Sequence, residues 1–203
     1  MAEQVRQQAP TDGVRHQAPT DGVRHQAPTD GVRHQAKVLT VSDGVVAGVR
    51  EDRSGVALVD RLAGAGFEVI EHRLVSDGVE EVSNALSYMA YGFNGVIVTT
   101  GGTGFGPRDL TPEATKRILD RTAPGMAEAM RAANPLGRLS RNIAGIRGAA
   151  LILNTPGSPS GAVEMLDAVL DVVPHAVDLM AGQSGGHPVG AGTHDPAEWA
   201  GTA

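Results

Sequence analysis

Residues 96–115 read Val-Ile-Val-Thr-Thr-Gly-Gly-Thr-Gly-Phe-Gly-Pro-Arg-Asp-Leu-Thr-Pro-Glu-Ala-Thr, and this stretch decides the fold class. It opens on β-branched apolar residues, which predicts a strand buried on both faces of a parallel sheet. The strand is followed by four glycines, Gly101, Gly102, Gly104 and Gly106. A backbone without Cβ atoms can turn sharply and point several N–H groups at one anion. Thr111-Pro112-Glu113 then carries the signals of a helix start, a cap, a proline and an acid, so Asp109 lies just outside that helix.

The glycine-rich loop leaves two interpretations open, because similar turns often serve only as tight corners in α/β proteins. It contains neither the dinucleotide fingerprint G-x-G-x-x-G nor the phosphate loop G-x-x-x-x-G-K-[ST]. A second segment favours ligand binding. An apolar strand over residues 149–153 leads into Asn-Thr-Pro-Gly-Ser-Pro-Ser-Gly at 154–161, and a helix begins near Ala162. Loops at the carboxyl ends of parallel strands converge on one crevice, so we expect both loops to face a common ligand.

Strands and helices alternate along the chain from Lys37. We predict strands over 38–41, 67–74, 95–100 and 149–153, single helices over 54–65, 111–121 and 125–134, and more than one helix across 162–180. A further helix precedes the central strand, because apolar residues recur there at helical spacing, at Val79, Val82, Leu86 and Met89. The alternation predicts an α/β domain over residues 37–182, with three α-β-α layers around a mostly parallel sheet.

The two ends of the chain lie outside this pattern. Residues 8–16 read Gln-Ala-Pro-Thr-Asp-Gly-Val-Arg-His and recur as 17–25 and 26–34. Each unit carries proline, Asp-Gly and a single valine, so it cannot bury enough apolar surface to offset the ordering of the chain. We therefore expect residues 1–36 to be a disordered tail, although the regularly spaced histidines could alternatively chelate a metal. Residues 183–203, rich in glycine, proline and alanine, are expected to form a flexible tail.

The composition excludes several classes of protein. The chain has 203 residues, close to the usual size of one domain, about 100–200 residues. A formal charge of −6 and the lack of any run of lysine or arginine argue against nucleic acid and anionic membranes as partners. Cysteine is absent, which excludes thiolate catalysis and fits a reducing compartment. Without an apolar stretch of roughly 20 residues or a signal-peptide pattern, we expect a cytoplasmic protein.

Four groups of residues match a known family in its order along the chain. They are Val41-Ser42-Asp43 with Glu51-Asp52-Arg53-Ser54-Gly55, Thr100-Gly101-Gly102-Thr103-Gly104 through Arg108-Asp109-Leu110-Thr111-Pro112-Glu113-Ala114-Thr115, Leu139-Ser140-Arg141, and Leu153-Asn154 with Pro156-Gly157. They resemble the molybdopterin adenylyltransferases, which include the bacterial proteins Mog and MoaB and the G domains of plant Cnx and animal gephyrin. The sequence departs from many bacterial members at Gly44, where they have arginine after Ser-Asp.

The resemblance implies a reaction in which ATP and molybdopterin give adenylated molybdopterin and pyrophosphate. The terminal phosphate of molybdopterin attacks the α-phosphorus of ATP, so the site must align two anions and neutralise growing charge with Mg²⁺. Carboxylates are the hard oxygen ligands that Mg²⁺ prefers. The resemblance places catalysis and Mg²⁺ binding on Asp77 and Asp109, which follow the second and central strands. Each could alternatively cap a helix or form a turn.

The other site residues follow from the resemblance alone. It implies that the glycine loop wraps a phosphate and that the remaining residues contact the nucleotide or the pterin. The implied substrate-binding residues are Ser42, Asp52, Gly101, Gly102, Thr103, Gly104, Thr111, Pro112, Glu113, Ser140, Asn154, Pro156, Gly157 and Ser158. Arg108 is either a screen for ligand phosphates or a solvated loop charge. His72 and His175 are isolated in the sequence, and we interpret both as structural.

The resemblance also implies a homotrimer or hexamer and, as a partner, the molybdenum-insertion protein of the pathway. Two alternative functions stay open. One is a protein that binds molybdopterin or assembles the cofactor without transferring adenylate. The other is an enzyme with a different substrate, because related domains occur in nicotinamide-nucleotide amidases. The presence of all three acids, Asp52, Asp77 and Asp109, favours the transferase.

Overall fold

The computed structural model of the protein describes residues 33–182. The expected C-terminal tail over 183–203, and the expected N-terminal tail apart from residues 33–36, lie outside the described residues. Within the described range, no helix is both long and apolar enough to cross a membrane.

A six-stranded, mostly parallel sheet forms the centre of the domain. Its spatial order is β2 (Glu68–Val75), β1 (Gln35–Val41), β3 (Gly95–Thr100), β6 (Ala150–Thr155), β5 (Ala144–Arg147) and β4 (Arg121–Thr122). The first four strands pair in parallel, and β5 and β4 are added antiparallel at one edge. The sequence predicts the four parallel strands, but it does not predict β4 and β5.

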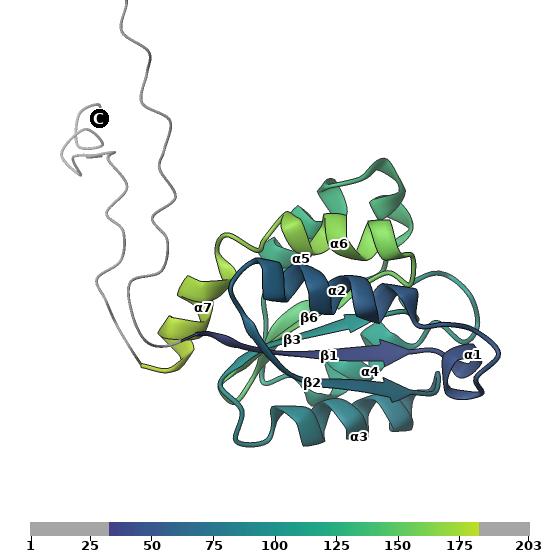
Figure 1. Cartoon of the computed structure of the whole chain (residues 1–203), viewed down its shortest axis with the longest axis horizontal. Coiled ribbons are helices and arrows are strands. Elements are labelled where there is room, and N and C mark those ends of the chain that lie inside the picture. The colour runs from purple at the N-terminus through teal and green to yellow at the C-terminus, as the bar shows by residue number, and fades with distance from the viewer. Residues whose placement is uncertain (1–32, 183–203) are drawn as a thin grey trace, which may run out of the picture. The chain divides into compact units, whose positions relative to one another are not determined.

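Helices cover both faces of this sheet (Figure 1). One face carries α2 (Arg53–Gly64), α5 (Pro124–Ala132), α6 (Pro159–Asp167) and α7 (Val173–Met180). The other face carries α3 (Val79–Ala90) and α4 (Thr111–Ile118). Two short helices lie in connections, α1 (Asp43–Val46) after β1 and the 3-10 helix η1 (Pro135–Leu139) after α5. The predicted three-layer α-β-α architecture is confirmed.

The hydrophobic core has two halves, one on each face of the sheet. Along β3, Val96 and Val98 face the α2 side, whereas Ile97 faces the α3 side, and all three are fully buried. This alternation follows from the two-residue period of a strand. Full burial of each such side chain contributes about 1.5–3 kcal/mol. Residues 96–98 therefore belong to a central strand that is buried on both faces, as the sequence predicts. This strand holds the start of the glycine loop in place.

The start of the domain lies earlier than the sequence predicts. Gln35 and Ala36 belong to β1 and pair with both neighbouring strands, and Ala36 is 0% exposed. Just before them, His34 Nε2 lies 2.8 Å from Asp178 Oδ1 on α7. The predicted boundary at residue 37 is therefore wrong by at least two residues, because a residue with a small side chain, Ala36, fills a core position that a periodicity search does not detect.

This boundary has a measurable consequence. Removing residues 1–32 is expected to leave the melting temperature unchanged. Removing residues 1–36 is expected to lower it by roughly 4–8 °C, because about 2 kcal/mol of burial and strand pairing is lost and 1 kcal/mol corresponds to about 2–4 °C in a domain of this size. Thermal unfolding followed by circular dichroism measures both variants. Equal melting temperatures for the two truncations would show that residues 33–36 do not belong to the folded unit.

Candidate active site

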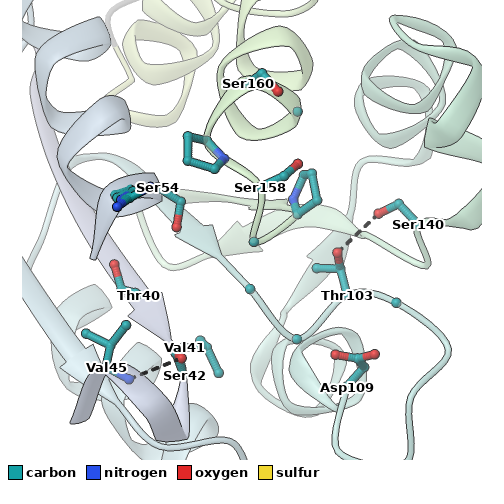
Figure 2. Close-up of a pocket in the computed structure, with 18 of the residues that line it drawn as sticks. Thr40, Val41, Ser42, Val45, Ser54, Thr103, Asp109, Ser140, Ser158 and Ser160 are labelled. Atoms are coloured by element: carbon teal, nitrogen blue, oxygen red, sulfur yellow. Dashed lines mark hydrogen bonds between the residues drawn. The ribbon is translucent and has the colours of Figure 1, made fainter. Parts of the chain in front are cut away.

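Most of the predicted site residues line one cleft, of about 1000 Å³, at the carboxyl ends of the parallel strands. They are Ser42, Asp52, Asp77, Gly101, Gly102, Thr103, Gly104, Asp109, Ser140, Pro156, Gly157 and Ser158. In Figure 2, side chains from several loops, including Ser42, Asp109 and Ser158, surround this space. The two glycine-rich loops touch each other here, since a Cβ on Gly157 would lie 3.4 Å from the Cα of Gly101. The expected convergence of the two loops is confirmed.

The glycine loop after β3 has the geometry of an anion cradle. Gly101 and Gly102 have φ angles of 96° and 62°, a region that residues with a Cβ rarely adopt. The backbone N–H groups of Gly102, Thr103 and Gly104 have no hydrogen-bond acceptor within residues 33–182. Because these residues line the cleft, their N–H groups are available to bind a ligand that carries negative charge.

The two predicted catalytic acids reach the cleft from different loops. Asp77 lies between β2 and α3, and its Oδ2 accepts a hydrogen bond of 2.9 Å from the amide of Asp43. A Cβ on Gly102 would lie 3.4 Å from Asp77 Oδ1, so this second oxygen borders the glycine loop. Asp109 accepts a hydrogen bond of 2.7 Å from the amide of Gly106 through its Oδ2. The turn-forming role considered for Asp109 is therefore real, and it leaves the other carboxylate oxygen free of protein partners in the described chain.

Four predicted site residues do not line the cleft: Thr111, Pro112, Glu113 and Asn154. Thr111 is buried and donates its hydroxyl to the carbonyl of Gly101 at 2.9 Å, so it supports the loop from behind instead of capping α4. Asn154 is 0% exposed, and its amide nitrogen donates to the hydroxyls of Thr99 and Thr115 at 3.0 and 3.1 Å. Thr111 and Asn154 are predicted to contact substrate, but neither lines the cleft, and the polar atoms of both side chains are bonded within the protein.

Arg141 organises the glycine loop, a role that the sequence analysis misses. Its Nε donates to the carbonyl of Gly104 at 2.7 Å, and its backbone amide donates to the carbonyl of Thr103 at 2.8 Å. Its guanidinium also bonds the carbonyl of Asp109 and the carboxylate of Glu113. The hydrogen bond from Arg141 lowers the pKa of Glu113 below its ordinary value. The sequence signal for Arg141 is the Leu139-Ser140-Arg141 motif, from which only Ser140 is predicted to belong to the site.

Asp52 anchors the first turn of α2 rather than offering a free carboxylate. Its Oδ1 accepts from the amide of Gly55 at 2.8 Å, and its Oδ2 accepts from the Thr40 hydroxyl at 2.7 Å. The same Oδ2 lies 2.9 Å from His72 Nε2, so His72 is not isolated, although its structural interpretation agrees with this contact. A Cβ on Gly55 would overlap these polar atoms. The cluster thereby fixes the turn that brings Arg53 and Ser54 to the cleft.

The remaining predicted residues differ in how free their polar groups are. Ser42 accepts a hydrogen bond of 3.4 Å from the amide of Val45, which is the cap of α1. Ser140 lies 3.4 Å from the hydroxyl of Thr103. Ser158 stands at the N-cap position of α6 and makes no side-chain capping bond there. Among residues 33–182 its hydroxyl has no hydrogen-bond partner, so it can bind a ligand. His175, also predicted to be structural, is exposed on α7.

The charges around the cleft are mostly negative. Four carboxylates line it, Glu51, Asp52, Asp77 and Asp109, against the two arginines Arg50 and Arg53. Arg53 pairs with Glu51 at 3.3 Å. The charged side chains that line the cleft therefore carry a net negative charge.

Comparison with known proteins agrees with this geometry. Residues 37–175 match the family described as "Probable molybdopterin binding domain". The molybdopterin adenylyltransferase of Helicobacter pylori strain J99 is 40% identical over 152 residues, which cover 71% of this chain and 86% of that protein. Gephyrin of Dictyostelium discoideum is 37% identical over 157 residues, which cover 70% of this chain and 22% of that protein.

Solved structures of similar proteins support the same family assignment. The molybdopterin biosynthesis enzyme MoaB of Thermus thermophilus is 47% identical, superposes with a TM-score of 0.70, and is covered over 97% of its length by 73% of this chain. The Mog protein of Mycobacterium ulcerans is 38% identical with a TM-score of 0.67, over 99% of its length and 72% of this chain. The resemblance drawn from the sequence motifs is confirmed, and this chain belongs to the molybdopterin-binding domain family that includes the molybdopterin adenylyltransferases.

Proposed function

We propose that this protein is an enzyme of molybdenum cofactor biosynthesis that transfers adenylate from Mg-ATP to molybdopterin and releases pyrophosphate. The names of the similar proteins support this reaction. The observation that carries the proposal is one cleft in which two carboxylates from different loops, Asp77 and Asp109, border a loop whose N–H groups have no acceptor in the described part of the chain.

The residues present fit Mg²⁺ held jointly by protein and substrate. Asp77 and Asp109 are hard oxygen donors, and each keeps one oxygen without a protein partner in the described chain. Residues 33–182 contain no group of three or more acidic, histidine or cysteine side chains placed to hold a metal by themselves. Mg²⁺ is commonly bound by one or two carboxylates together with substrate phosphates and water. When bound, it supplies the positive charge that the acidic cleft lacks.

The chain itself contributes position rather than proton transfer. The nucleophile is a phosphate, whose second pKa is about 6, so it is already ionised at neutral pH and needs no general base. The amides of Gly102, Thr103 and Gly104 bind phosphate oxygens in a fixed direction, and Arg141 keeps that loop rigid. Holding two reactants in line in this way lowers the barrier by about 7–11 kcal/mol in the most favourable cases.

The test is a direct assay. Purified protein is mixed with molybdopterin, ATP and Mg²⁺, and adenylated pterin is separated by chromatography, with EDTA in a parallel reaction. We expect product only when Mg²⁺ is available. Binding of molybdopterin without conversion would contradict the enzyme and support the alternative of a non-catalytic binding or assembly protein.

We also propose that the protein forms a homotrimer, or a hexamer made of two trimers. Strand β2 is an edge of the sheet and exposes Ile70 and Leu74, while α2 exposes Val56. An edge strand with exposed apolar side chains is normally covered by another chain or another element. Light scattering coupled to size-exclusion chromatography is expected to give three or six times the mass of one chain. A monomer at micromolar concentration would contradict this.

A further inference from the structure

Three loops at the carboxyl ends of β2, β1 and β3 are tied together by one pair of acids and one arginine. The backbone amide of Asp43 donates to Asp77 Oδ2 at 2.9 Å, and the backbone amide of Asp77 donates to Asp43 Oδ1 at 3.1 Å. Arg108, from the loop after β3, forms an ion pair with Asp43, in which Nη2 lies 2.7 Å from Oδ2, and the same Nη2 donates to the carbonyl of Asp77 at 2.9 Å. Both oxygens of Asp43 are therefore occupied, each by a different loop.

The arrangement controls the direction of one carboxylate. Because Asp77 Oδ2 is held by the Asp43 amide, rotation of the Asp77 side chain is restricted and Oδ1 is left beside Gly102. Asp43 and Arg108 do not themselves line the cleft. Any effect that they have on the reaction must therefore pass through Asp77 or through the loops.

Stability alone does not explain the cluster. The side chains of Asp43 and Arg108 are 47% and 66% exposed, and an ion pair with that much exposure contributes only about 0–1 kcal/mol. The reciprocal hydrogen bonds join the first residue of α1 to the loop after β2, and each is made between a backbone amide and a side-chain carboxylate. The main consequence of these hydrogen bonds is therefore that they fix the position of Asp77.

We infer that Asp43 is a positioning residue for Asp77 and that Arg108 holds Asp43 in place for this purpose. The inference rests on the proposed adenylyl transfer, in which Asp77 contacts the metal or the reacting phosphates. The carboxylate of Asp43 accepts a hydrogen bond from the Asp77 backbone amide, and the backbone amide of Asp43 donates one to the Asp77 carboxylate. Arg108 supplies the positive charge between two neighbouring acids, and it anchors the loop that also carries Asp109.

A double-mutant cycle tests whether Asp43 acts through Asp77. Asp43→Ala is expected to lower kcat for adenylyl transfer by about 10–100-fold, the usual effect of losing a group that orients a metal ligand, with KM for ATP changed by less than about threefold. In the Asp77→Asn background the same change is expected to have less than about a threefold effect. Equal effects of Asp43→Ala in the two backgrounds would show a general structural role and overturn the inference.

Two further variants test the role of the hydrogen bond to the Asp77 amide and the specificity of the effect. Asp43→Asn keeps an oxygen that accepts from the Asp77 amide, so it is expected to retain at least about a third of the parental kcat. Asn and Ala variants with equally low kcat would contradict a role through that hydrogen bond. Asp60→Ala removes an acid from the exposed face of α2, away from the cleft, and is expected to leave both kinetic constants unchanged.

A measurement that does not depend on activity separates this inference from the proposed reaction. Amide hydrogen exchange by NMR is expected to become at least about tenfold faster at the Asp77 amide in Asp43→Ala, because its acceptor is removed. Unchanged exchange at Asp77 would overturn the positioning role. Faster exchange in a protein that transfers no adenylate would leave the contact established and would contradict only the proposed reaction.

Discussion

Asparagine at position 77 or at position 109 is expected to lower adenylyl transfer by about two to four orders of magnitude. This is the scale for losing roughly 3–5 kcal/mol of preorganised electrostatic stabilisation. Asparagine keeps the shape of aspartate and one acceptor oxygen, so the hydrogen bonds from the Asp43 amide to Asp77 and from the Gly106 amide to Asp109 can persist. What disappears is the negative charge that would bind Mg²⁺.

The measurement combines single-turnover transfer with two controls. Thermal unfolding and molybdopterin binding are expected to match the parent protein in both variants, which separates chemistry from folding. Asp60→Asn makes the same chemical change on the exposed face of α2 and is expected to transfer at the parental rate. Rates within a few-fold of the parent for both Asp77→Asn and Asp109→Asn would show that neither acid is catalytic, and the binding protein would become the better proposal.

Valine at position 102 is expected to abolish detectable binding of the nucleotide and the pterin. A Cβ on Gly102 would overlap the hydroxyl of Thr111 and lie 3.4 Å from Asp77 Oδ1. The hydroxyl that supports the Gly101 carbonyl must then move, and the branched side chain occupies the space where the loop amides meet a phosphate. Positive φ adds a strain of about 1–3 kcal/mol, so the folded state is also destabilised.

Gly92 provides a matched control for the strain. Its φ of 61° is nearly that of Gly102, 62°, but a Cβ on Gly92 would meet nothing within 4 Å. It lies between α3 and β3, at the end of the sheet away from the cleft. Gly92→Val is therefore expected to lose similar stability and to keep ligand binding. If isothermal titration shows equal binding for the two variants, the cleft beside Gly102 does not hold the ligand.

The parallel strands of this fold could be predicted because their sequences allow few other structures. Residues 95–100 and 149–153 are continuous runs of apolar and β-branched side chains, which suit burial on both faces. Strands β4 and β5 carry no such signal. Arg121 and Thr122 of β4 are exposed, and β5 is the short sequence Ala-Gly-Ile-Arg. Their pairing depends on neighbours in space, which local sequence patterns do not record.

In the candidate site, too, local sequence patterns predict some features, whereas others depend on contacts between distant residues. Loop residues such as Asp77 and Asp109 can be found because they follow strands whose carboxyl ends must meet. Asn154 is buried and lies outside the cleft because β6 runs on to Thr155, two residues beyond the predicted end. The contacts of Arg141 with Gly104 and of Asp43 with Asp77 join residues that are 37 and 34 positions apart in the chain. No periodic pattern reports contacts of that kind.

Both ends of the folded unit lie at the amino end of the parallel sheet, where His34 and Asp178 meet, and Figure 1 shows the start of β1 beside α7. The cleft opens at the opposite end, at the carboxyl ends of the same strands. The two ends of the described unit therefore lie at the end of the sheet opposite the site. This geometry makes the unit a module that can be built into longer chains without obstructing its own chemistry, as its match to 22% of Dictyostelium gephyrin illustrates.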